Sequence, residues 1–128
     1  MTASSPLLDL GEQRYVLLTT FRRTGEPVAT PVWIARYRDE LLVTTPEGTG
    51  KLKRLRNNPR VELQAASRFG RAKRGSAVVA ASVVSSEAQT PALADIFRHK
   101  YRLEYRVFKL FEGRTKAGVR PRVVLHLG

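Results

Sequence analysis

Three cations and a hydroxyl are concentrated in the segment TGKLKR, residues 49–54. It follows an extended β-type run at residues 41–45 and a turn that contains proline and glycine. A helix that begins after such a turn presents free backbone N–H groups. Thr49, Gly50 and Lys51 would therefore bring hydrogen-bond donors and positive charge to one point. This combination predicts an anion site, and we expect it to hold a phosphate group.

Side chains that could carry acid–base, thiolate or metal chemistry are scarce. The chain has no cysteine, which excludes disulfides, thiolate catalysis and cysteine-ligated metals. His99 and His126 are the only histidines, and neither accompanies an acid–base pair or a metal-ligand spacing. We therefore predict no catalytic side chain and no metal ligand. This absence agrees with a protein that binds and orients a cofactor, which carries the chemistry.

The length and composition set the kind of protein. A chain of 128 residues, 42% hydrophobic and 27% charged, has the composition of one globular domain spanning residues 1–128. No apolar run approaches the roughly 20 residues that cross a bilayer. Residues 1–14 also lack the basic start of a signal peptide. The sequence therefore predicts a cytoplasmic protein without a membrane segment.

The formal net charge of +12 comes from 23 lysines and arginines against 11 acidic residues. Most of the cations lie in two regions, residues 51–74 and 98–122. Such a balance attracts polyanions, whether nucleic acid, anionic lipid or a phosphorylated cofactor. Each single cation can equally be a solvated surface residue, so charge alone does not choose among these partners.

Six segments have the β-branched and aromatic character of strands. They cover residues 14–23, 28–37, 41–45, 60–67, 77–85 and 122–127. The first is expected to be buried on much of both faces, and it forms a hairpin with the second. Pro31 cannot donate to a ladder and marks an edge or a bulge. The fifth segment, small and apolar, is expected to be buried against other backbone.

Two helices complete the pattern. A short basic helix carries Lys51 and ends near Pro59, because proline disrupts the preceding turn. A longer helix begins at Thr90 and Pro91, which supply a cap and a favourable first position. Its apolar face, expected to pack on the barrel or on a partner subunit, comprises Leu93, Ile96, Phe97, Tyr101 and Phe108.

The order of these elements indicates a mainly β (α+β) protein. We predict a split β-barrel of about six antiparallel strands, with a short helix after the third strand and a longer helix before the last.

Three separated runs carry a resemblance to a known family. RYVLLTTFRRTGEPVATPVWIARY, LLVTT and TGKLKRLRNNPRV are similar to the split-barrel flavin and deazaflavin oxidoreductases related to pyridoxamine 5′-phosphate oxidase. Within this family the likeness is greatest to the small actinobacterial branch that uses coenzyme F-420. It covers roughly residues 12–85, with a looser match at KYRLEYRVFKLF and RVVLHL.

The resemblance implies roles for particular residues. Lys51 stands where the family keeps its phosphate-binding lysine, with Thr49 and Gly50 just before it, while Lys53 and Arg54 are weaker candidates. The second strand would run beside the cofactor ring, and the third would contact the ribityl chain. The residues implied on these two strands are Thr30, Pro31, Val32, Trp33, Thr44 and Thr45. Trp33 could instead belong to the core or to a dimer interface, and the two threonines of the third strand could simply pack within it.

Family members are homodimers with the cofactor between subunits, so the resemblance implies the same here. Arg71, Lys73 or the C-terminal arginines would then be able to reach the partner's ligand. Two departures bear on the cofactor. The chain has Ala80 and Ala81 where the family usually has a glutamate–glycine pair, and Gly50 where flavin-binding relatives often have an arginine. The lost cation disfavours tight binding of FMN and leaves F-420 as the expected cofactor.

The resulting hypothesis is a reductase that transfers hydride from reduced F-420 to a small electrophilic or unsaturated substrate. The alternatives are an FMN-binding member of the same family and a non-catalytic carrier of a cofactor or tetrapyrrole. A nucleic-acid-binding barrel would need aromatic residues interleaved with cations. Most aromatic residues of the β-region suit a core, so nucleic acid is the least favoured partner.

Overall fold

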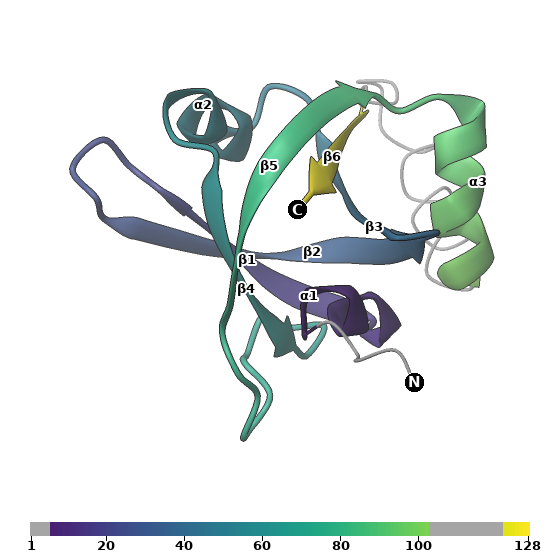
Figure 1. Ribbon diagram of the computed structural model, residues 1–128, viewed down its shortest axis with the longest axis horizontal. Coiled ribbons are helices and arrows are strands. Elements are labelled where there is room, and N and C mark those ends of the chain that lie inside the picture. Colours follow the sequence, from purple (N-terminus) through teal and green to yellow (C-terminus); the bar gives the residue numbers. More distant parts are fainter. Residues whose placement is uncertain (1–5, 103–121) are drawn as a thin grey trace.

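The computed structural model of the protein describes residues 6–102 and 122–128, and Figure 1 shows their arrangement. Its strands are β1 (Tyr15–Phe21), β2 (Pro27–Tyr37), β3 (Glu40–Pro46), β4 (Arg60–Ala66), β5 (Val79–Ala88) and β6 (Arg122–Leu127). Its helices are α1 (Pro6–Asp9), the 3-10 helix η1 (Leu10–Glu12), α2 (Gly50–Asn57) and α3 (Pro91–Lys100). The strands pair antiparallel in the order β1-β2-β3-β6-β5-β4 and close into a barrel. The predicted fold class is therefore confirmed.

Alternating side chains fill the barrel. On β1, Val16 and Leu18 point inward and are fully buried, while the residues between them are half-buried. The expectation that β1 is buried on much of both faces is thus correct for one face and only partly correct for the other. Ile34 on β2 and Leu63 on β4 complete the same cluster. The short apolar pieces of α1 and η1 pack against it through Leu7 and Leu10.

β2 changes its pairing along its length. Residues 27–32 pair with β1, and residues 33–37 pair with β3. Pro31 lies in the first part, opposite Leu17, so its missing N–H faces no β3 partner. The prediction that Pro31 marks a strand edge is therefore confirmed. This open edge of β2 forms one wall of the site described below.

β5 differs from the prediction in extent and in burial. It reaches Ala88, and of its residues only Ala81 is buried. Val84 is 71% exposed at a register shift between Val83 and Ser85. A short run of small apolar residues fits a strand covered on both faces, but in this chain nothing described packs over the outer face of β5. The expectation of a buried fifth strand is wrong for the single chain.

α3 covers the outer face of the sheet formed by β2, β3 and β6 (Figure 1). The Thr90 side chain accepts a hydrogen bond from the Leu93 backbone N–H at 3.3 Å, as expected for its cap position. Phe97 and Tyr101 are almost fully buried, which confirms the predicted apolar face. The part of that prediction that concerns Phe108 lies outside the described residues. No helix of residues 6–102 and 122–128 is long and apolar enough to span a membrane.

Candidate functional site

A pocket of about 270 Å³ opens where β2 leaves β3, beside the start of α2. Its walls come from the four strands β1, β2, β3 and β6, from α2 and from the loop after β4. They consist of Tyr15, Pro31, Val32, Trp33, Thr44, Thr45, Pro46, Lys51, Arg68 and Arg122. The described lining contains three cations and no acidic side chain. Its electrostatic character therefore suits an anion.

Lys51 is placed by the way α2 begins and ends. Thr49 occupies the N-cap position in an extended conformation, and α2 stops at Asn57, two residues before Pro59. Leu52 and Leu55 anchor the helix on the barrel core, which leaves Lys51 half-buried at the pocket. Burial lowers the pKa of Lys51, and the positive charges of Arg54 and Arg122 lower it further. An anion would relieve this repulsion.

Arg122 reaches the same pocket from the other end of the chain. The antiparallel register of β3 and β6 sets it opposite Pro46. Its Nε donates to Thr44 Oγ1 at 3.0 Å, and that hydroxyl donates to Gln89 Oε1 at 2.5 Å. The backbone N–H of Gln89 in turn donates to the Arg122 carbonyl at 2.9 Å. This closed set of bonds fixes the orientation of the guanidinium.

Trp33 forms a flat wall of the pocket and is supported from behind. Its ring stacks on that of Tyr101, with centroids 4.5 Å apart and planes within 6°. Tyr101 is itself held by the backbone of β2, because its hydroxyl accepts from the Ile34 N–H at 3.0 Å. Trp33 is therefore half-buried and rigidly placed, rather than wholly within the core.

Three threonine hydroxyls near this end of the barrel are buried and have no hydrogen-bond partner among the described residues. They belong to Thr30, Thr45 and Thr49. Thr45 is 1% exposed and lines the pocket. A buried hydroxyl without a partner costs free energy unless water or a ligand satisfies it. The unpaired group at Thr45 is therefore an independent sign that the pocket binds a polar molecule.

The structure brings together about half of the site residues expected from the sequence. Pro31, Val32, Trp33, Thr44, Thr45 and Lys51 line the pocket, whereas Thr30, Thr49, Gly50, Lys53 and Arg54 do not. Lys53 is exposed on α2. Arg54 instead donates from Nε to the buried Thr20 hydroxyl at 2.6 Å.

Gly50 and Arg54 share one space at the start of α2. A Cβ atom on Gly50 would lie 2.9 Å from Arg54 Nη1. The glycine thus leaves room for a guanidinium supplied one helical turn later. Position 50 has no arginine, but the guanidinium of Arg54 occupies the space beside it. The charge of Arg54 lowers the pKa of Lys51.

The sequence reasoning missed four lining residues, Tyr15, Pro46, Arg68 and Arg122. Tyr15 and Pro46 belong to segments that were correctly predicted as strands or turns, and only the pairing shows that they face the pocket. Arg68 and Arg122 were counted among the basic clusters. No local signal separates them from other arginines, because strand pairing and a loop bring them to Lys51.

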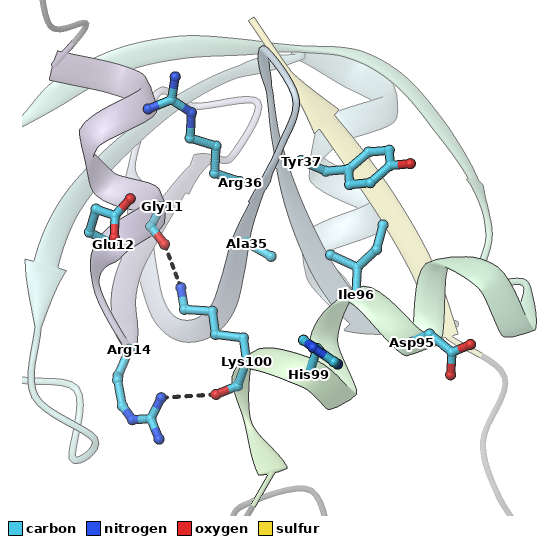
Figure 2. A pocket seen from close by; sticks show the side chains of 10 residues that line it. All are labelled: Gly11, Glu12, Arg14, Ala35, Arg36, Tyr37, Asp95, Ile96, His99 and Lys100. Carbon is cyan, nitrogen blue, oxygen red and sulfur yellow. Dashed lines mark hydrogen bonds between the residues drawn. The ribbon is translucent and has the colours of Figure 1, made fainter.

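A second pocket, of about 690 Å³, lies between the N-terminal segment and α3 (Figure 2). Arg14, Arg36 and Lys100 line it together with the acidic Glu12 and Asp95. The opposed charges give this pocket no clear preference for an anion. It is therefore a weaker candidate for binding a phosphate than the pocket at Lys51.

Lys100, at the edge of the second pocket, serves the fold. Its Nζ donates to the carbonyls of Gly11 at 2.7 Å, Gln13 at 2.5 Å and Ile34 at 2.5 Å. An ammonium has three N–H donors, so these acceptors use all of them. Burial lowers the pKa of Lys100 to about 8, the charge of Glu12 opposes this, and Arg14 adds to it. Lys100 ties α3 to η1 and β2.

Neither histidine lies in the pocket at Lys51. His99 is exposed on α3 and borders the second pocket. His126 on β6 lies between two carboxylates, with Nε2 2.7 Å from Glu87 and Nδ1 3.4 Å from Glu40. Within residues 6–102 and 122–128, no group of three histidine or acidic side chains could hold a metal ion.

Comparison with known proteins points to one family. The sequence model of pyridoxamine 5′-phosphate oxidase matches residues 8–127, nearly the whole chain. None of the curated proteins matches this chain.

Solved structures share the fold at low sequence identity. A protein described as an F-420 reductase superposes with a TM-score of 0.65 and 18% identity, covering 99% of this chain and 94% of that one. A FAD-binding protein from Mesorhizobium loti gives 0.56 and 20%, with coverages of 97% and 87%. A haem storage protein from Vibrio cholerae gives 0.55 and 12%, with coverages of 90% and 81%. At these identities the likeness concerns the fold.

Proposed function

Because this chain belongs to the pyridoxamine 5′-phosphate oxidase family, we propose that it binds a phosphorylated deazaflavin, coenzyme F-420, and reduces a small unsaturated or electrophilic substrate. The observation that carries the proposal is the pocket at Lys51, where fixed cations meet an unpartnered buried hydroxyl. The F-420 reductase among the structures of the same fold agrees with this choice.

The phosphate end of the cofactor would lie between α2 and β6. Lys51 supplies a compact charge, and Arg122 supplies a guanidinium held by Thr44. The first backbone N–H groups of α2 and the Thr45 hydroxyl offer further donors. Thr30 and Thr49 have unpartnered hydroxyls near the same end of the barrel and would bind through water. Lys53 and Arg54 would act from a distance, through the field alone.

The ring of the cofactor would lie along residues 31–33 of β2. Residues 31 and 32 pair with β1 and not with β3, so this part of β2 has an edge along which a flat ligand could lie. Trp33, which pairs with Thr44, closes the end of the wall. The stack of Trp33 on Tyr101 limits rotation of the indole. A rigid wall holds a ring at a fixed distance from a reacting molecule, which is the protein's main contribution in cofactor chemistry.

When bound, the reduced deazaflavin supplies a hydride, and a proton from solvent completes the two-electron reduction of the substrate. The chain's own residues bind and orient. Lys51 and Arg122 hold the phosphate end, Val32 and Trp33 exclude water from one face, and the described lining places no histidine or carboxylate near the reaction. In this proposal the chain contributes binding and orientation, and the proton comes from solvent.

The second subunit of a homodimer would complete the site. A pocket of about 270 Å³ is smaller than the range of about 300–1,000 Å³ typical of sites that enclose a ligand. A complete cofactor must therefore extend beyond this chain. We propose that a second copy covers it, with the exposed Arg71 on the loop after β4 facing that copy. Lys73 is less suited, because its Nζ already donates to Gln13 Oε1 at 2.9 Å.

FMN is the second candidate cofactor. Arg54 fills the space beside Gly50 with a guanidinium, so the start of α2 has the charge to hold a phosphate dianion. A non-catalytic carrier of a cofactor or tetrapyrrole is a further alternative, favoured by the lack of an acid–base residue in the described lining. Cytoplasmic location belongs to the proposal as the setting in which these cofactors are found.

Titration of the purified protein with oxidised F-420 and, separately, with FMN tests the proposal by fluorescence. Low-micromolar binding of F-420 with much weaker binding of FMN is expected. The reverse order would replace F-420 by FMN. Binding of neither cofactor would overturn the proposal and leave the net charge of +12 to be explained by a polyanion such as nucleic acid.

A further inference from the structure

The loop between β4 and β5 places an arginine in the lining of the pocket and an exposed aromatic ring beside that arginine. Arg68 lines the pocket, and Phe69 beside it is 77% exposed. The Arg68 guanidinium carbon lies 4.7 Å from the centroid of the Phe69 ring. The pair therefore presents a planar cation stacked on a flat apolar ring. The proposed phosphate-binding groups, Lys51 and Arg122, do not include it.

The loop is preorganised. Ser67 organises it, because its N–H donates to the Arg71 carbonyl at 2.8 Å and its hydroxyl accepts from the N–H groups of Phe69 and Arg71 at 3.3 Å each. A single bridge between Ala66 and Ala72 closes the base. Arg68 and Phe69 are therefore presented on a tight turn rather than on a long open loop.

The turn also packs against the ring wall. Gly70 has a φ of +80° and sits so close to Pro31 that a Cβ atom on it would lie 3.4 Å from Pro31 Cγ. The left-handed φ favours glycine, and the distance shows that the turn lies in van der Waals reach of Pro31. Because Pro31 belongs to the wall along which the cofactor ring would lie, Arg68 and Phe69 stand at the ring end of the pocket.

We propose that Arg68 and Phe69 form a substrate subsite that binds a planar aromatic or conjugated carboxylate next to the cofactor ring. A single guanidinium matches a single carboxylate in a two-point hydrogen bond. The exposed face of Phe69 supplies stacking area for the attached ring. This inference rests on the proposed function and adds a substrate class to it.

A pair of probes of equal shape tests the charge requirement. The protein saturated with F-420, or with FMN if that is the cofactor it binds, is titrated by calorimetry with 2-naphthoate and with the neutral 2-naphthamide. We expect naphthoate to bind about tenfold more tightly, the usual worth of a charged hydrogen bond. Equal affinity for the two probes would overturn the inference.

Variants of the turn locate the effect. Arg68→Gln is expected to remove the preference for naphthoate over naphthamide. Phe69→Ala is expected to weaken both probes together. Arg74→Gln, an exposed cation of the same loop outside the pocket, is the matched control and should change neither quantity.

Four outcomes separate the proposed subsite from competing explanations. An equal loss of naphthoate affinity in Arg74→Gln would show attraction by net charge and overturn the subsite. A change from dimer to monomer in Phe69→Ala, with naphthoate affinity unaltered, would assign Phe69 to the subunit interface and overturn it too. Normal cofactor binding without a naphthoate preference rejects the subsite alone, whereas failure of the wild type to bind either cofactor rejects the proposed function.

Discussion

At the scale of single residues, the site depends on uncompensated polar groups. Lys51 shares its surroundings with Arg54 and Arg122, and the described lining provides no carboxylate to balance them. The hydroxyl of Thr45 lacks a partner in the same pocket. Burial of the Thr45 hydroxyl without a partner, and of the Lys51 ammonium among like charges, costs free energy. A bound anion would offset both costs, which supports the proposed ligand site.

Separate alanine substitutions of the two lysines of α2 test this interpretation of the site. Lys51→Ala is expected to weaken binding of F-420 about tenfold, because one charge-assisted hydrogen bond is lost. Lys53→Ala removes an identical charge from an exposed position on the same helix and is expected to have little effect. Both affinities follow from fluorescence titration. Unchanged affinity in Lys51→Ala would remove that lysine from the site.

The affinity for the cofactor should depend on pH through the protonation of Lys51. Burial and the neighbouring arginines lower the pKa of Lys51 in the free protein, whereas a bound anion raises it again. Binding therefore takes up a proton at high pH, so affinity should fall as pH rises through the lowered value, below the 10.5 of an ordinary lysine. Titrations from about pH 7 upward check this. In Lys51→Arg the fall should disappear, because a guanidinium stays charged.

At the scale of elements, α3 and the edge of β2 together hold the ring wall in place. Tyr101, just after α3, is fully buried, and its hydroxyl accepts from the Ile34 N–H and lies 2.6 Å from the Arg14 carbonyl. Lys100, the residue before Tyr101, adds hydrogen bonds to η1 and β2. The end of α3 is thus fastened to three segments at once. Because Trp33 stacks on Tyr101, this junction also limits the movement of Trp33.

Loss of one hydroxyl should show how much the junction contributes. Tyr101→Phe is expected to lower the free energy of unfolding by about 1–3 kcal/mol, since buried backbone groups lose their partner while the stack on Trp33 is retained. Urea denaturation measures the difference. Tyr37→Phe, at a tyrosine that is 43% exposed, is the control and should be nearly neutral. Equal stability of the two variants would assign the junction to Lys100 alone.

Sequence patterns predicted the elements well and the site only in part. Period-two alternation and the Pro59 stop are local properties, so the strands and α2 could be placed to within a few residues. Arg122 could not be assigned, because it enters the pocket only through its register opposite Pro46. The contact made by Arg54 could not be predicted for a related reason. Its partner Thr20 lies on a strand distant in the chain, and no helical spacing predicts that contact.

At the scale of the whole molecule, a strongly basic chain contains a small pocket lined by three of its cations. The net charge of +12 draws anions toward the protein in general, while Lys51 and Arg122 would determine where the proposed phosphate binds. The outer face of β5 adds an exposed apolar surface at Val78 and Val84. A strand of small apolar residues that the single chain leaves open is the feature expected where a second copy packs.

A charge on that face tests the dimer. We expect the wild type to sediment as a dimer and Val84→Glu to sediment largely as a monomer, because the substitution would bury an unpaired carboxylate between subunits. Ala92→Glu places the same charge on the exposed first turn of α3 and should leave the dimer intact. A monomeric wild type would mean that the pocket is completed by this chain alone.

The turn held by Ser67 has a bearing on how such a protein diversifies. Its hydrogen bonds run among its own residues and meet the barrel only at the bridge between Ala66 and Ala72 and at the contact of Gly70 with Pro31. Substitutions at positions 68 and 69 are therefore expected to leave the strand register of the barrel unchanged. Duplicated genes could therefore acquire new substrate selectivities by changes in these two codons alone. A combinatorial library of variants at these two positions would sample such selectivities with little effect on solubility.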